Sequence, residues 1–226
     1  MGVFMILSLI ASSMLKSRFR KFSKIPTRNG LSGAEVAQRM LNDHGCHGVK
    51  LKSVEGELTD HYNPATKTVN LSPDVYHGRN VAAAAVAAHE VGHAVQHAES
   101  YAWLQMRSAL VPLQNVSSKV LNFIFIAMFL GSFLMSSLLP LETALMIIIA
   151  SYGVFTLFSL ITLPVEFNAS NRALAWLSSA GVTSESTQVH AKSALGWAAS
   201  TYVIAALSSL ASLLYYVALL AGSRRD

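Results

Sequence analysis

The residues best suited to chemistry are His89, Glu90 and His93, which form the sequence His-Glu-Val-Gly-His. They lie in an Ala-rich stretch, residues 80–100, that contains no Pro and whose composition predicts a helix. Side chains four residues apart share one face of a helix, so both imidazoles can reach one metal ion while Glu90 projects beside it. Imidazole nitrogens suit Zn²⁺, and a neighbouring carboxylate can accept a proton from water whose pKa the metal lowers. The pattern predicts metal-assisted hydrolysis, with His89 and His93 as ligands and Glu90 as the general base.

A catalytic zinc site usually has three protein ligands, so a third one is needed. His97 continues the stripe of histidines, but three histidines spaced this way spread over about 12 Å of helix axis, too far to reach one ion. Proteases with three His ligands place a Gly turn between the second and third, and no such turn occurs here. We therefore expect His97 to support the site from outside the ligand set, or to be an ordinary polar surface residue.

A carboxylate is the remaining candidate, and few acids follow the histidines: Glu99, Glu142, Glu166, Glu185 and Asp226. Glu142 falls in the turn between two apolar segments, on the opposite membrane side if each segment crosses once. Glu185 lies in a Thr-Ser-Glu-Ser stretch typical of a helix cap. Glu166 lies at the end of an apolar segment, on the same side as the histidines, where an acid needs a partner. We predict Glu166 as the third ligand; the alternative is a boundary charge that snorkels or pairs with Arg172.

The composition indicates a membrane protein. Of the 226 residues 52% are hydrophobic and only 13% charged, with a mean hydropathy of +0.42, which makes a purely soluble domain improbable. Three apolar segments are long enough to cross a hydrocarbon core: residues 120–139, 143–163 and 198–221. They contain no acid, base or His, which argues against a metal transporter.

A shorter apolar segment, residues 2–15, precedes a run of basic side chains: Lys16, Arg18, Arg20, Lys21, Lys24 and Arg28. A cleaved signal peptide carries its charges before the apolar core, so this order predicts an uncleaved anchor. The positive-inside rule places the basic run in the cytoplasm. The net charge of +5 is then explained by topology and lipid head groups, and we expect no nucleic-acid partner.

These features predict a mostly α-helical integral membrane protein with a zincin-like helix, a small β-sheet and about four transmembrane helices. A capped helix is expected near residues 31–41, where Ser32 precedes Glu35 by three positions. Short strands are expected within residues 49–58 and 61–71. The expected order is an N-terminal anchor (1–16), a cytoplasmic zincin-like catalytic domain (17–119), a transmembrane hairpin (120–165), a cytoplasmic segment with the third ligand (166–197) and a C-terminal transmembrane helix (198–222).

Four longer sequence segments resemble those of a known family: residues 89–97 (HEVGHAVQH), 71–76 (LSPDVY), 107–112 (RSALVP) and 163–167 (LPVEF). Over nearly its whole length the chain resembles the YugP-type membrane zinc metallopeptidases of bacteria, which are distantly similar to HtpX-like and Ste24-like proteases. The resemblance implies a zinc-dependent integral-membrane peptidase with the ligand set and base given above.

In those distant relatives an Asp four residues after the ligand Glu supports a ligand His. Here that position is Ser170, and Asn168 or Asn171 are candidates for the same supporting role.

The resulting expectation is an endopeptidase of the bacterial inner membrane, multi-pass, with one Zn²⁺ per chain and its active site on the cytoplasmic side. Its substrate would be an unfolded or membrane-tethered protein, added as a strand near residues 69–71. The alternative is a zinc-stabilised membrane scaffold or regulatory pseudo-protease, which would need the ligands but not Glu90. His61 and Tyr62 are either cleft-lining or ordinary surface residues, and His190 and Tyr76 offer no spacing that makes either an oxyanion donor.

Overall fold

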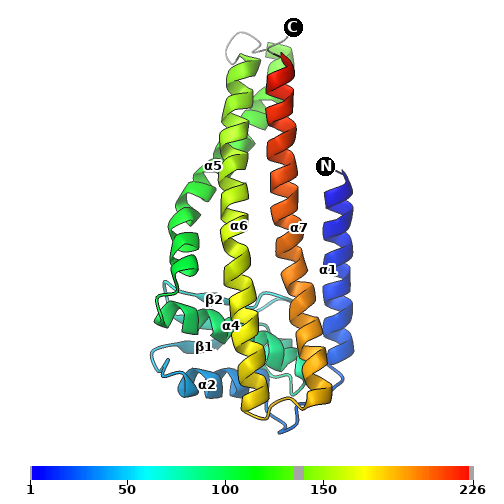
Figure 1. Ribbon diagram of the computed structural model, residues 1–226, viewed down its shortest axis with the longest axis vertical. Coiled ribbons are helices and arrows are strands. Elements are labelled where there is room, and N and C mark those ends of the chain that lie inside the picture. The colour runs from blue at the N-terminus through cyan, green and yellow to red at the C-terminus, as the bar shows by residue number, and fades with distance from the viewer. Residues whose placement is uncertain (1, 135–139, 224–226) are drawn as a thin grey trace.

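The computed structural model describes residues 2–134 and 140–223. Four long helices rise from a compact lower part that contains the sheet and the shorter helices (Figure 1). The long helices are α1 (Gly2–Phe22), α5 (Ala102–Leu134), α6 (Leu141–Ser179) and α7 (Glu185–Ser223). The lower part contains α2 (Gly33–Asp43), β1 (Lys50–Ser53), β2 (His61–Asn63), β3 (Thr68–Leu71), α3 (Pro73–Tyr76) and α4 (Val81–Ala98). The predicted class, mostly helical with a small sheet, is confirmed.

All four long helices contain a stretch apolar and long enough to cross a membrane. In α5 this stretch is Ala102–Phe129, so it begins earlier than the expected segment 120–139, of which residues 135–139 lie outside the described part. Helices α6 and α7 have 39 residues each, about 58 Å, whereas a hydrocarbon core is about 30 Å thick. Both helices therefore extend well beyond a bilayer, and residues 166–197 are their lower ends and the turn that joins them.

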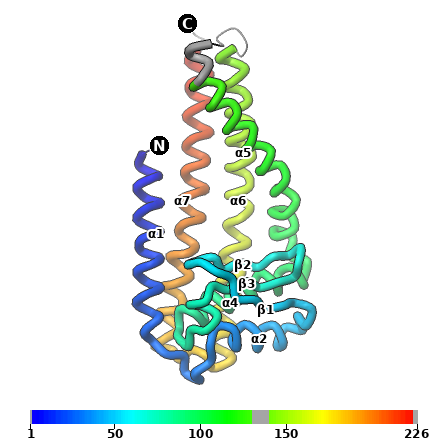
Figure 2. Tube along the Cα trace, turned by 180° about the vertical axis from the view of Figure 1, so that it is seen from behind, coloured from blue at the N-terminus to red at the C-terminus, as the bar shows by residue number. Residues whose placement is uncertain are grey.

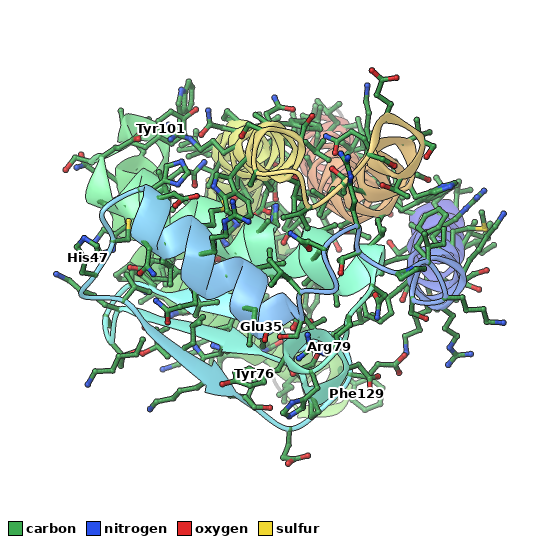
Figure 3. All side chains as sticks on the ribbon, turned by 90° about the horizontal axis from the view of Figure 1, so that it is seen from below. Glu35, His47, Tyr76, Arg79, Tyr101 and Phe129 are labelled. Carbon is green, nitrogen blue, oxygen red and sulfur yellow. The ribbon has the colours of Figure 1, made fainter. Side chains whose placement is uncertain are left out.

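The short helix α2 begins at the predicted cap. The Ser32 hydroxyl accepts the Glu35 N–H at 3.2 Å, and the Glu35 carboxylate accepts the Ser32 N–H at 2.7 Å. Such a cap contributes about 1 kcal/mol. Glu35 also pairs with Arg79 at 2.9 Å, which ties α2 to the loop before α4 (Figure 3).

The sheet has the order β1-β3-β2, with β1 parallel and β2 antiparallel to β3. All four residues of β3 are buried, and both edges of this strand are hydrogen-bonded to a neighbouring strand. Among the described residues β2 pairs only with β3, so β2 is an edge strand, and it lies close to α4 (Figure 2). The expectation of a substrate-binding edge at residues 69–71 is therefore wrong, because those residues form the central strand.

Helix α4 is the centre of the lower part. It is buried from Val81 to Gln96 except for the half-buried Val86, and it packs against α2, α6 and α7. Seven of its fifteen buried positions are Ala, whose small side chains let the neighbouring helices approach α4 closely. A helix held on so many sides presents the His89-Glu90-Val91-Gly92-His93 motif in a fixed orientation.

Candidate metal centre

His89, His93 and Glu166 meet in the buried space between α4 and α6. The Oε2 atom of Glu166 lies 3.3 Å from His89 Nε2 and 3.5 Å from His93 Nε2. One potential ligand atom from each residue falls within 4.8 Å of the other two, and all three side chains are buried. The structure thus brings the three predicted ligands together across 77 positions of sequence.

The geometry of this cluster fits zinc. Ligand atoms about 2.0–2.1 Å from a tetrahedral zinc ion lie about 3.3–3.4 Å apart, close to the two distances from Glu166. Burial alone would lower the pKa of His93, but the adjacent Glu166 carboxylate outweighs it and raises that pKa. The site therefore attracts positive charge, whether as a proton or as a metal cation.

Gln96 fixes the orientation of the His93 ring. Its side-chain NH₂ donates to the Val165 carbonyl at 2.8 Å and to Asn168 Oδ1 at 2.9 Å. Its Oε1 is thereby left to accept from His93 Nδ1 at 3.0 Å. Because Nδ1 carries the proton, the lone pair of Nε2 points toward Glu166 and is free for a metal.

The support of His93 continues outward through Asn168. Asn168 Oδ1 also accepts from Arg172 Nε at 2.8 Å, and Arg172 pairs with Glu99 at 2.7 Å. The alternative pairing of Arg172 with Glu166 is not the one observed. Asn168, a candidate supporting residue, thus contacts Gln96 rather than a ligand His.

His89 is supported by Ser170, whose hydroxyl lies 3.1 Å from His89 Nδ1. A hydroxyl can donate as well as accept, so it fixes the imidazole tautomer less firmly than a carboxylate would. Asn171 is exposed and lies outside the ligand cluster. His97 bonds through Nδ1 to the Tyr62 hydroxyl at 2.7 Å, outside the ligand cluster.

Glu90 connects the centre to the edge strand. One carboxylate oxygen, Oε2, accepts the backbone N–H of Tyr62 at 2.9 Å, which joins α4 to β2. The Glu90 side chain is 8% exposed and lines the same cleft as His93 and Glu166. The predicted base is therefore anchored beside the cluster.

Two clefts reach the cluster from different directions. The polar cleft has a volume of about 430 Å³ and runs beside residues 60–64, which include His61 and Tyr62 of β2. The second, the apolar pocket, has a volume of about 130 Å³ and lies between α4, α1 and α7. Both are lined by Glu90, Glu166 and Tyr202, so they meet at the metal centre.

Two side chains from the long helices flank Glu166. Arg107 of α5 places Nη2 4.0 Å from Glu166 Oε1, the oxygen that does not face the histidines. Tyr202 of α7 lines both clefts together with Glu166. The buried Nε of Arg107 has no hydrogen-bond partner among the described residues. His190, which stacks on Phe22, and Tyr76 line neither cleft.

Gly92, within the motif, allows α4 and α6 to meet. A Cβ atom at this position would lie 2.7 Å from the Ala169 carbonyl oxygen and 3.2 Å from its Cα. Both atoms belong to the α6 backbone, so a larger residue could be accommodated only by moving one helix. The helix separation fixed here sets the distance from the histidines to Glu166.

We expect Gly92→Ala to push α4 away from α6, although Ala is the better helix former. Overpacking of this kind costs about 1–3 kcal/mol, and the displaced ligands should also hold zinc more weakly. Thermal unfolding with and without zinc measures both effects, and Gly196→Ala, at an open position on α7, is the matched control. A Gly92→Ala protein as stable and as zinc-loaded as wild type would contradict this role.

Comparisons with known proteins agree with this geometry. A family model described as "Putative neutral zinc metallopeptidase" matches residues 1–221. The chain belongs to this family. It is 44% identical over 220 residues to "Putative membrane protease YugP" of Bacillus subtilis (strain 168), covering 97% of this chain and 94% of that protein. No solved structure matches. The family resemblance seen in the sequence is confirmed.

Sequence reasoning missed several residues of the site. No sequence pattern marked Gln96 or Tyr202, because both reach the site through the packing of helices that are far apart in sequence. Arg107 carried a usable signal, since a charge within a helical stretch hydrophobic enough to cross a membrane often marks a function. Gly92 carried another, as the single Gly in the Ala-rich helix.

Proposed function

We propose that this protein is a zinc-dependent membrane endopeptidase, with His89, His93 and Glu166 as ligands of one Zn²⁺ per chain. The observation that carries the proposal is the position of Glu90, anchored by the Tyr62 N–H at 2.9 Å beside three converging ligand atoms. A structural zinc site closes its coordination with protein ligands, whereas three ligands leave a fourth position open. The cleft of about 430 Å³ at this cluster gives a substrate access to it.

The proposed reaction is hydrolysis of a peptide bond by water. Zinc bound at the cluster would supply Lewis acidity, which lowers the pKa of water and polarises a carbonyl group. Glu90 accepts the proton of the attacking water and then delivers it to the leaving amine. The hydrogen bond from Tyr62 holds one Glu90 oxygen in place, which favours proton transfer through the other.

We propose that the substrate lies extended along β2. In the antiparallel ladder His61 and Asn63 face β3, while the Tyr62 backbone groups point outward toward α4. Because the Tyr62 N–H is bonded to Glu90, its carbonyl is the acceptor that a substrate N–H would use. Backbone pairing tolerates many sequences, which suits unfolded or membrane-tethered protein substrates.

Arg107 is our candidate for the group that binds the scissile carbonyl oxygen. Its side chain lines the polar cleft, and its Nη2 lies 4.0 Å from Glu166 Oε1, so the guanidinium group is a cationic donor beside the metal ligands. A positioned donor of this kind stabilises the negative charge that develops on oxygen during hydrolysis. The role is additional to its electrostatic contact with Glu166.

We further propose that the site faces the cytoplasm. The basic C-terminal end of α1 lies at the same end of the molecule as the sheet and the α6–α7 turn (Figure 1). Reporters inserted after Lys24 and at Gly181 should both report the cytoplasm, and one at Glu142 should report the outside. Opposite locations for Lys24 and Gly181 would overturn this topology.

The direct test of the function is cleavage of an unfolded reporter by the full-length protein in lipid vesicles. We expect cleavage with zinc and none after chelation, followed by gel analysis and mass spectrometry of the products. The scaffold alternative predicts bound zinc but no cleavage under any of these conditions.

A further inference from the structure

The apolar pocket beside the metal centre is smaller than the polar cleft and has more apolar residues in its lining. Its volume is about 130 Å³ against about 430 Å³, and eight of its fourteen lining residues are apolar, against three of thirteen in the polar cleft. Its walls come from three elements: Leu15 and Phe19 of α1, Val86 of α4, and Ala194, Leu195, Ala198 and Ala199 of α7. His89, Glu90 and Glu166 form its inner end.

We infer that this pocket binds one aliphatic side chain of the substrate, that of a residue flanking the scissile bond. The inference rests on the proposed function and deepens it by naming a substrate preference. Successive side chains of an extended peptide point to opposite sides, so a side chain that flanks a carbonyl group at the metal centre can point out of the polar cleft. The apolar pocket opens at that point, because the two clefts share Glu90, Glu166 and Tyr202.

The volume of the pocket limits what can occupy it. Sites for whole small molecules usually measure about 300–1,000 Å³, whereas an apolar cavity of about 150 Å³ holds a benzene-sized group. At about 130 Å³ the pocket fits a single Val, Leu or Ile side chain. Charged side chains are disfavoured, since the acids that line the pocket are already engaged: Glu166 with the two histidines, Glu90 with the Tyr62 N–H and Asp60 with Ser72.

Leu58 gives independent support. It lines the pocket from the loop between β1 and β2, and its φ of 58° lies in the left-handed region. A branched residue adopts this conformation at a cost of about 1–2 kcal/mol, which Gly would avoid. The loop thus keeps an unfavourable backbone conformation while placing an apolar side chain against the pocket.

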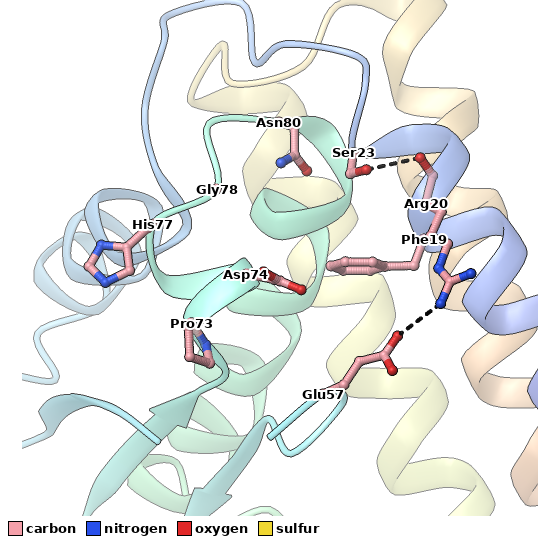
Figure 4. A pocket seen from close by; sticks show the side chains of 9 residues that line it. All are labelled: Phe19, Arg20, Ser23, Glu57, Pro73, Asp74, His77, Gly78 and Asn80. Atoms are coloured by element: carbon pink, nitrogen blue, oxygen red, sulfur yellow. Dashed lines mark hydrogen bonds and ion pairs between the residues drawn. The ribbon is translucent and has the colours of Figure 1, made fainter. Parts of the chain in front are cut away.

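Helix α1 closes the outer side of the pocket. Phe19 also lines a wider depression of about 740 Å³ (Figure 4). That depression is lined by Arg20, Glu57, Asp74 and other polar residues and contains none of the metal-centre side chains. Leu15 is the last apolar residue of α1 before its basic end, so the pocket lies near the depth where that helix leaves the apolar layer. Such a position suits substrates that emerge from a bilayer.

The test uses zinc-loaded full-length protein and a series of peptide hydroxamates that differ in one side chain: Gly, Ala, Leu, Phe or Asp. Binding is measured by calorimetry, so the readout requires the metal but not turnover. We expect the Leu compound to bind at least about tenfold more tightly than the Gly and Asp compounds. Ala198→Leu, which fills the pocket, should abolish this preference, while Ala205→Leu on an exposed face of α7 should retain it.

A second variant covers the case in which Ala198→Leu fails to fold. Leu58→Gly fits the left-handed backbone and removes one wall, so it should shift the preference from Leu toward larger side chains. Equal binding of all compounds by wild type, or an unchanged preference for Leu in both variants, would overturn the inference. A lipid chain would then be the candidate occupant of the pocket. If the Leu preference holds but wild type cleaves no reporter, the proposed function fails while the pocket assignment stands.

Discussion

The Glu90→Gln protein is expected to bind zinc at wild-type stoichiometry and to lose hydrolysis. Gln keeps the size of the side chain, and its amide oxygen can still accept the Tyr62 N–H. It cannot accept a proton from water, and loss of a general base costs about 10²- to 10⁴-fold in rate. Cleavage of an unfolded reporter, with metal analysis of the same sample, measures both quantities.

The control for this variant is Glu55→Gln, an exposed carboxylate in the loop after β1, which should cleave at the wild-type rate. Unchanged turnover in zinc-loaded Glu90→Gln would remove the base from the mechanism and leave the scaffold alternative standing.

Glu166→Ala should empty the metal centre. Its Oε2 lies 3.3 and 3.5 Å from the two Nε2 atoms, and two histidines alone hold zinc weakly. The loss in zinc affinity should exceed the about 10- to 100-fold that removal of a ligand's hydrogen-bond partner costs. Glu166→Gln should fall between Ala and wild type, because an uncharged amide oxygen is a poorer ligand for a dication.

His97→Ala is the matched comparison for this experiment. His97 contacts the Tyr62 hydroxyl rather than the ligand cluster, so its removal should leave zinc occupancy largely intact. Elemental analysis of the purified variants decides between the two residues. Full zinc occupancy in Glu166→Ala together with loss of zinc in His97→Ala would contradict the assignment of Glu166 as the third ligand.

The motif helix and its flanking elements were predictable because their signals are local. The four-residue spacing of His89 and His93 is a property of one helix, and the cap at Ser32 needs only Glu35 nearby. The choice of Glu166 needed only the scarcity of acids and the side of the membrane on which each falls. The apolar segments were predictable for the same reason, since length and composition define them.

The remaining features depend on contacts between distant elements. The order of the three strands depends on which strands pair, and nothing within residues 69–71 distinguishes a central strand from an edge strand. Gln96 looks like any polar residue near a helix end until α6 supplies the Val165 carbonyl. The apolar pocket is lined by residues of four helices and a loop, which no sequence window contains.

The central claim is that one zinc ion per chain, held between α4 and α6, drives peptide-bond hydrolysis. Zinc titration of the metal-stripped full-length protein, followed by the rate of reporter cleavage, tests it most directly. We expect the rate to rise from zero in proportion to added zinc and to saturate at one equivalent per chain. Cleavage that persists in the stripped protein, or a fully zinc-loaded protein that cleaves nothing, would contradict it.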